Sequence, residues 1–164
     1  MKDVRIIVTG GTIDKVHNTH TEGLSFAADN SSHLPKMLGV GRCYFPVVEI
    51  LMLKDSLEFD DVDRNAILET IKKASETAIV ITHGTGTMDK TARFLENKVQ
   101  DKTIVITGAM RPFSLSSSDG EFNLGGAIIG AQLLEPGVWG IMNGRVFPAN
   151  QISKNAELGR FDVS

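Results

Sequence analysis

Residues 78–88 read AIVITHGTGTM, an apolar run that ends in threonines and glycines. The same pattern occurs twice more, as IIVTGG at residues 6–11 and as IVITGA at residues 104–109. Short apolar runs rich in β-branched residues are typical of buried strands, and a glycine lets the chain turn sharply afterwards. These three stretches predict a sheet in which several strands end in glycine turns at the same edge.

Helical patterns separate the predicted strands. The clearest lies at residues 60–75, where acidic residues come first and apolar residues follow at helical spacing. Such alternation predicts an α/β fold with three layers, a mainly parallel sheet with helices on both faces. The expected strands are 4–9, 47–53, 78–82 and 103–107, and the expected helices are 31–38, 60–75, 88–99 and 120–134. Residues 138–143 and 145–148 flank Gly144 and are expected to form a hairpin or an edge-strand pair.

The composition indicates one globular domain over residues 1–164, with 41% hydrophobic and 23% charged residues. A net charge of −3 gives no electrostatic basis for binding nucleic acid or an anionic membrane. No apolar run approaches the roughly 20 residues of a membrane-spanning helix. The only cysteine, Cys43, cannot form an internal disulfide, and we expect a cytoplasmic protein.

The first candidate functional residue is Thr12, which follows Gly10 and Gly11 at the end of the first predicted strand. The backbone N–H groups of such a turn can hold an oxyanion or a carboxylate, and Thr12 adds a hydroxyl at the same place. The alternative is a tight turn without chemistry. A phosphate-binding loop is not indicated, because no G-x-G-x-x-G or P-loop spacing occurs.

The second candidate is Thr85, again directly after a predicted strand. A threonine hydroxyl is a weak nucleophile unless a base removes its proton. His83 could be that base, or it could be a structural histidine that hydrogen-bonds the backbone of a crowded turn. A lysine with a lowered pKa could serve instead, and Lys154, in a polar loop beyond the last predicted strand, could reach the same edge.

The loop LKDSLEFDD, residues 53–61, holds further polar residues after the second predicted strand. Asp60 and Asp61 are expected to cap the following helix. Asp55 and Ser56 come earlier and could face a cleft. His17 and His20 have H-x-x-H spacing without a third ligand nearby, so we predict neither a metal site nor a cofactor.

Five motifs together resemble those of bacterial-type L-asparaginases. In order they are TGGTID, KDS, HGTGTM, VITGAMRP and MNGRVFPANQISK. The chain is similar to the amino-terminal catalytic domain of that family over nearly its whole length, most of all to short asparaginases without the carboxyl-terminal domain. An archaeal amidotransferase subunit that releases ammonia shares this domain.

The resemblance implies a flavodoxin-like sheet and hydrolysis of the side-chain amide of L-asparagine to L-aspartate and ammonia. Thr12 matches the primary nucleophile of the family. Thr85 matches a second threonine, which works with a lysine that matches Lys154. The resemblance also implies a homo-oligomer, a dimer or tetramer, with asparagine as its small-molecule partner.

The resemblance further assigns the substrate-binding positions. Asp55, with Ser56 beside it, falls where the family binds the α-groups of the substrate. Backbone groups meet the substrate at positions that match Gly11, Gly84 and Ala109. Gly86 stands where the family usually has an aspartate that grips the α-amino group, and the first loop lacks the tyrosine that the family carries there.

Two other functions remain open at this point. One is a non-catalytic protein that binds a small amino acid or a dicarboxylate, which the missing aspartate and tyrosine favour. The other is an ammonia-releasing subunit of a larger amidotransferase, in which a partner supplies the missing groups. The joint presence of Thr12, Thr85 and Lys154 favours the enzyme.

Overall fold

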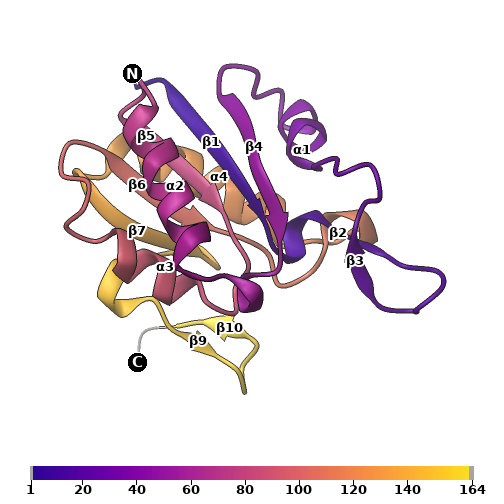
Figure 1. Ribbon diagram of the computed structural model, residues 1–164. Coiled ribbons are helices and arrows are strands. Elements are labelled where there is room, and N and C mark those ends of the chain that lie inside the picture. Colours follow the sequence, from indigo (N-terminus) through magenta and orange to yellow (C-terminus); the bar gives the residue numbers. More distant parts are fainter. Residues whose placement is uncertain (1, 163–164) are drawn as a thin grey trace.

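A six-stranded sheet forms the centre of the computed structural model, which describes residues 2–162 (Figure 1). Five strands are parallel, and the last strand is antiparallel to its neighbour. The predicted mainly parallel sheet is therefore confirmed. In spatial order the strands are β4 (Val47–Lys54), β1 (Val4–Gly10), β5 (Ala78–Thr82), β6 (Thr103–Thr107), β7 (Gly137–Met142) and β8 (Arg145–Pro148).

The order of the strands locates the ligand edge that is typical of this fold class, between β1 and β5. Counted along the chain, the five parallel strands have the flavodoxin-like order 2-1-3-4-5. The chain moves outward in one direction from β1 to β4 and in the other from β5 onward. In open α/β sheets, ligands bind outside the carboxyl ends of the strands at this switch point.

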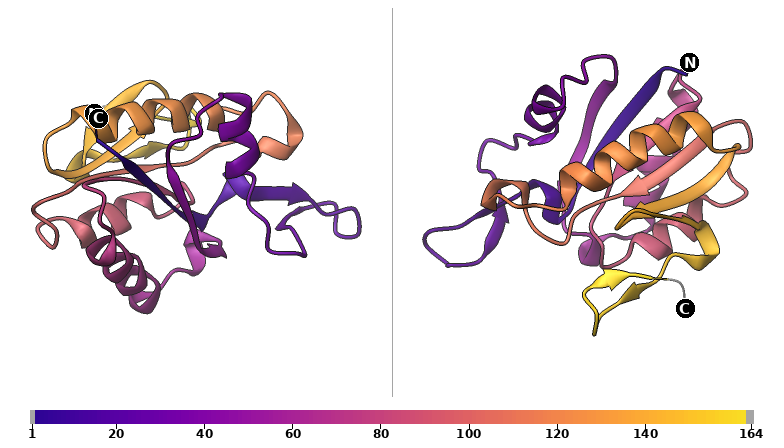
Figure 2. Two further views of the ribbon diagram at one scale, coloured as in Figure 1. Left: turned by 90° about the horizontal axis from the view of Figure 1, so that it is seen from above. Right: turned by 180° about the vertical axis from the view of Figure 1, so that it is seen from behind.

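Helices cover both faces of the sheet, as the alternating sequence pattern predicts (Figure 2). Side chains such as Ile7 and Ile81 pack in one cluster with α2 (Asp61–Lys73) and α3 (Met88–Leu95). Their neighbours along the strands, such as Ile6 and Val80, pack in a second cluster with α1 (Leu34–Val40) and α4 (Gly120–Leu133). Strands buried on both faces explain the continuous apolar runs in the sequence.

The helix boundaries differ from the prediction where side chains or turns compete with the helix. Asp60 caps α2 in a capping box with Asp63, as expected, while Asp61 lies in the first turn. The helix predicted over 31–38 begins only at Leu34, because Ser32 and the His33 N–H group bind a buried carboxylate instead. The helix predicted over 88–99 ends at Leu95, as a left-handed residue, Asn97, reverses the chain soon after.

Two short hairpins were not predicted. The strands β2 (Lys15–His17) and β3 (Leu24–Phe26) form an arm that projects from the body beside the end of β1 (Figure 1). The strands β9 (Lys154–Asn155) and β10 (Arg160–Phe161) form a small hairpin near the carboxyl end of the chain. Strands of two or three residues are too short for a period-2 pattern to reveal.

Single turns of 3-10 helix follow three of the parallel strands and β8, and two of them hold predicted site residues. Their bounds are η1 (Thr12–Asp14), η2 (Ser56–Glu58), η3 (Phe113–Leu115) and η4 (Ala149–Gln151). Among the helices within residues 2–162, none is long and apolar enough to cross a membrane.

Candidate active site

Glycines allow the loops at the carboxyl ends of neighbouring strands to touch. A Cβ atom on Gly11 would lie 2.5 Å from the backbone nitrogen of Gly84, and one on Gly108 would lie 2.3 Å from the carbonyl oxygen of His83. Gly11 also has a φ of +84°, a backbone conformation that residues with a Cβ rarely adopt. The loops after β1, β5 and β6 are thus packed backbone against backbone, and Thr12 and Thr85 follow the two touching glycines.

Lys154 reaches Thr85 from the other end of the chain. Its Nζ donates a hydrogen bond of 3.2 Å to Thr85 Oγ1, although the residues are 69 positions apart. The β9–β10 hairpin that carries Lys154 is fixed by buried Phe161, whose N–H group donates to Asn143 Oδ1 at 2.9 Å. A polar cavity of about 240 Å³ beside Thr85 is lined by both Gly86 and Lys154.

Thr12 opens η1 and is partly exposed. Its hydroxyl group has no hydrogen-bond partner within residues 2–162 and is therefore free to meet a ligand. Two residues later, the fully buried Asp14 accepts hydrogen bonds from the Ser32 hydroxyl (2.9 Å) and the His33 N–H group (2.7 Å). These bonds fix η1 to the start of α1, and burial raises the pKa of the Asp14 carboxyl.

His83 is a structural histidine rather than a base. It is fully buried, and this burial lowers its pKa to about 4, so the imidazole is neutral. Its Nδ1 lies 2.8 Å from the Gly84 carbonyl oxygen, which can only accept, so Nδ1 donates and Nε2 accepts from the Thr91 hydroxyl. The Gly84 carbonyl thus points toward the buried ring, and in a trans peptide the N–H group of Thr85 points the opposite way.

Ser56 brings the loop after β4 to the same place. The residue is only 1% exposed, and its hydroxyl has no hydrogen-bond partner in the described chain. A Cβ atom on Gly84 would lie 2.5 Å from Ser56 Oγ, so this hydroxyl faces the segment that carries Thr85. A buried polar group without a partner is costly, and a polar ligand would satisfy it.

Asp55 is already engaged in this structure. Its carboxylate accepts from the Leu57 N–H group at 3.0 Å, capping η2, and forms an ion pair with Lys15 of β2. The hydrogen bond from Lys15 lowers the pKa of Asp55. Lys15 was not among the candidates drawn from the sequence, although it lies only three residues after Thr12 in the TGGTIDK stretch.

Gly86 and Ala109 differ in what they offer a ligand. Gly86 is exposed and lies outside the left-handed region, and a Cβ atom there would lie 2.8 Å from Leu57 Cδ2. Ala109 is fully buried, and its side chain packs in the core cluster of α4, which leaves only its backbone for a ligand.

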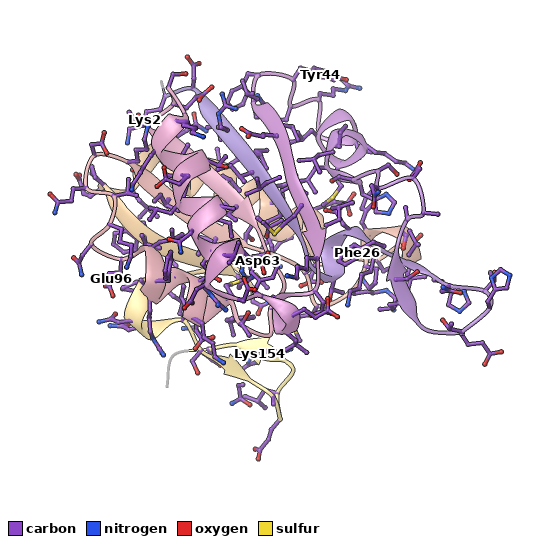
Figure 3. The ribbon with its side chains drawn as sticks, viewed as in Figure 1. Lys2, Phe26, Tyr44, Asp63, Glu96 and Lys154 are labelled. Atoms are coloured by element: carbon purple, nitrogen blue, oxygen red, sulfur yellow. The ribbon has the colours of Figure 1, made fainter. Side chains whose placement is uncertain are left out.

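Other residues considered from the sequence lie elsewhere. His17 is on β2 of the arm, His20 lies at its turn, and no metal-binding group of three or more His, Cys, Asp or Glu exists in residues 2–162. Tyr44, the one tyrosine, is 79% exposed at the end of the molecule opposite Lys154 and cannot replace a loop tyrosine (Figure 3).

Comparison with known proteins decides the family. The sequence model of a protein family, that of the asparaginase amino-terminal domain, matches residues 3–160. The chain belongs to the asparaginase family. L-asparaginase 2 of Escherichia coli is 31% identical over 170 residues, which cover 94% of this chain and 47% of that protein. A glutamyl-tRNA(Gln) amidotransferase subunit of Methanococcus vannielii is 30% identical, over 89% of this chain and 35% of that protein.

Solved asparaginases share the fold. L-asparaginase I of Vibrio cholerae superposes with a TM-score of 0.83 at 27% identity, covering 99% of this chain and 51% of that one. The thermostable L-asparaginase of Thermococcus kodakarensis gives a TM-score of 0.80 at 25% identity, covering 98% of this chain and 51% of that one. These findings confirm the resemblance drawn from the motifs. The chain spans about half the length of the asparaginases it matches.

Proposed function

We propose that this chain hydrolyses the side-chain amide of L-asparagine to L-aspartate and ammonia, with Thr12 as the nucleophile. The observation that carries the proposal is the hydrogen bond from Lys154 to Thr85, beside the contact between Gly11 and Gly84. These contacts support a proton-transfer pair, Thr85 and Lys154, that serves the neighbouring loop with the free hydroxyl of Thr12. A threonine needs such a neighbour to lose its proton.

The reaction then has two balanced steps. In the first, Thr12 Oγ1 forms a bond to the amide carbon, the C–N bond breaks, and ammonia leaves with the proton that the hydroxyl gave up. In the second, water attacks the resulting ester, and the acid is released while Thr12 regains its proton. Lys154, acting through the Thr85 hydroxyl, moves the proton in both steps.

Backbone and side-chain donors support the transition state and the substrate. The N–H group of Thr85, directed away from His83, is suited to stabilise the oxyanion of the tetrahedral intermediate. The unpaired Ser56 hydroxyl is suited to donate to the substrate carboxylate. Both groups lie in loops that the glycine contacts hold rigidly against one another.

We also propose a homo-oligomer, a dimer or a tetramer. Large apolar side chains on the outer face of α4 support this, because Phe122, Ile129 and Leu133 are 67%, 56% and 77% exposed. Light scattering should give a multiple of the 17.8 kDa chain mass. A monomer mass with full activity would overturn this part of the proposal.

An ammonia-release assay with L-asparagine, D-asparagine and L-glutamine tests the proposed reaction. We expect release from L-asparagine above the rate without protein. The similarity to the amidotransferase of Methanococcus vannielii favours a second function, an ammonia-releasing component of a larger assembly. In that case release should appear only with a co-purifying partner. Ligand binding without ammonia release from any amide would favour a non-catalytic binding protein.

A further inference from the structure

The charged groups at the mouth of the site are unusual for recognition of an amino acid. L-asparagine carries an α-ammonium group, and a site selects such a group with a free carboxylate. Asp55 directly precedes Ser56 and caps the start of η2, the turn that holds Ser56. It is paired with Lys15, whose side chain is 16% exposed and also lies over the Phe26 ring at 5.7 Å.

Two other acids around the cleft also form ion pairs. Asp63 pairs with Lys54 at 2.6 Å, and Asp89 pairs with Arg93 at 3.5 Å. The pKa of the Lys54 ammonium is raised mainly by its hydrogen bond to Asp63 and, to a smaller extent, by the charges of Asp60 and Glu58.

Lys154 differs from Lys15, Lys54 and Arg93, which each form an ion pair with an acid. In the part of the chain that the structure describes, it pairs with no acid and donates only to the Thr85 hydroxyl. Lys154 is therefore available as a donor, whereas the carboxylates of Asp55, Asp63 and Asp89 are each paired with a cation.

The polar cavity beside Thr85 has one apolar wall, at Gly86. Leu57 lies over Gly86, so near that a Cβ atom on the glycine would be 2.8 Å from its terminal carbon. A methylene group of a ligand fits against such a surface, whereas an ammonium group there would lose water without gaining a partner. The unpaired hydroxyl of Ser56 and the Nζ donor of Lys154 instead suit a carboxylate.

We propose that the site selects a primary amide that bears a carboxylate but no α-ammonium group, a monoamide of a short dicarboxylic acid such as succinamate. The Lys15–Asp55 ion pair is the element that rejects the ammonium, and Lys15 is thus a specificity-determining residue. This inference rests on the proposed function for the amide chemistry, but the selection by charge concerns binding alone.

Isothermal titration calorimetry with succinate and L-aspartate tests the selection without catalysis. These are the acids that succinamate and L-asparagine would yield. The parent protein should bind succinate roughly tenfold or more tightly than L-aspartate, as expected for one missing charge-assisted hydrogen bond. Equal binding, or tighter binding of L-aspartate, overturns the proposal.

The variant Lys15→Met then tests the assigned residue. It frees the Asp55 carboxylate, so the preference for succinate should fall by roughly tenfold or more. The matched control is Lys36→Met, which removes a lysine that lies over the Phe113 ring at 5.8 Å but forms no ion pair in residues 2–162. An unchanged ratio in folded Lys15→Met removes Lys15 from this role.

Ammonia-release rates separate this inference from the proposed function. The parent should show a higher kcat/KM for succinamate than for L-asparagine. If neither amide releases ammonia but succinate still binds more tightly than L-aspartate, the proposed hydrolysis is wrong and the inferred ligand class is supported. Release from L-asparagine with a higher kcat/KM than from succinamate would support hydrolysis and defeat the inference. Should Lys15→Met not fold, the parent's binding ratio still decides.

Discussion

Gly11 and Gly84 are packed so closely that a Cβ atom on the first would lie 2.5 Å from the backbone nitrogen of the second. This contact joins the loops after β1 and β5, the two strands between which the strand order reverses. Each glycine is followed by one of the two threonines of the proposed site. The spacing between the two hydroxyl-bearing loops therefore depends on the absence of a side chain at position 11.

Gly11→Ala should lower both stability and activity. The methyl group would clash with backbone, and the φ of +84° strains any residue with a Cβ. Backbone strain and overpacking each cost about 1–3 kcal/mol, so the free energy of unfolding should fall by at least ~2 kcal/mol. Denaturant unfolding measures it.

The matched control is Gly125→Ala in the interior of α4, where a Cβ would meet open space. It should raise the unfolding free energy by about 0.5–1 kcal/mol. If Gly11→Ala is as stable and active as the parent, the loops are not held in the way described.

His83 should make folding stability depend on pH in a defined window. Burial lowers its pKa from the ordinary 6.5 to about 4, so between these values the unfolded chain binds more protons than the folded one. Stability is therefore retained above pH 6.5 and falls as the pH decreases from 6.5 toward 4, by up to ~3 kcal/mol.

Urea unfolding at pH 7.5, 6 and 5 measures this dependence. These pH values lie above the range in which most carboxylates titrate. The slope should persist in His20→Gln, since His20 is exposed at the turn of the arm. It should disappear in His83→Gln. A parent protein equally stable at pH 7.5 and pH 5 would contradict a neutral, buried His83.

Lys154→Met should reduce turnover more than substrate binding. A group that moves protons acts mainly in the transition state, so the loss belongs in kcat. The expected loss is ~100-fold to ~10,000-fold. Steady-state kinetics of ammonia release provide the measurement, with Lys90→Met, an exposed lysine on the nearby α3, as control. A change confined to KM would make Lys154 a binding residue only.

Gly86→Asp should improve the binding of L-asparagine. The backbone at Gly86 is not left-handed, so a side chain is tolerated once Leu57, which is 74% exposed, moves aside. A new charge-assisted hydrogen bond to the α-ammonium is worth about 1.5–3 kcal/mol, or roughly a tenfold to hundredfold fall in KM. Gly86→Asn has the same shape without the charge and should give no such gain. Equal effects of the two variants would show that charge is not the cause.

Local patterns in the sequence were sufficient to predict the sheet and most helices. The apolar runs of β1, β5 and β6 are buried on both faces, so they read as strands without any tertiary information. Asp60 likewise signals a helix start by its own chemistry. The end of α3 was less predictable, since the turn at Asn97 replaces helix in a stretch of ordinary composition.

Candidate site residues could be named from sequence patterns, but most contacts between distant residues could not. Thr12 and Thr85 were named because they follow predicted strands at glycine turns, and Lys154 because its loop could reach the same edge; Lys154 indeed hydrogen-bonds Thr85 across 69 positions. The pair of Lys15 and Asp55 joins residues 40 positions apart, and neither position signals the other in a single sequence. The unpaired Ser56 hydroxyl is visible only once Gly84 is packed against it.

The most direct test of the central claim is ammonia release by Thr12→Ala. Thr12 is proposed to form the covalent bond to the amide carbon, and its free hydroxyl makes no hydrogen bond that folding requires within residues 2–162. Circular dichroism should therefore show an intact fold, while turnover of the best amide substrate falls by more than ~1,000-fold. Thr19→Ala, at an exposed position of the arm, should keep the parent rate. A folded Thr12→Ala protein that releases ammonia near the parent rate would contradict the account.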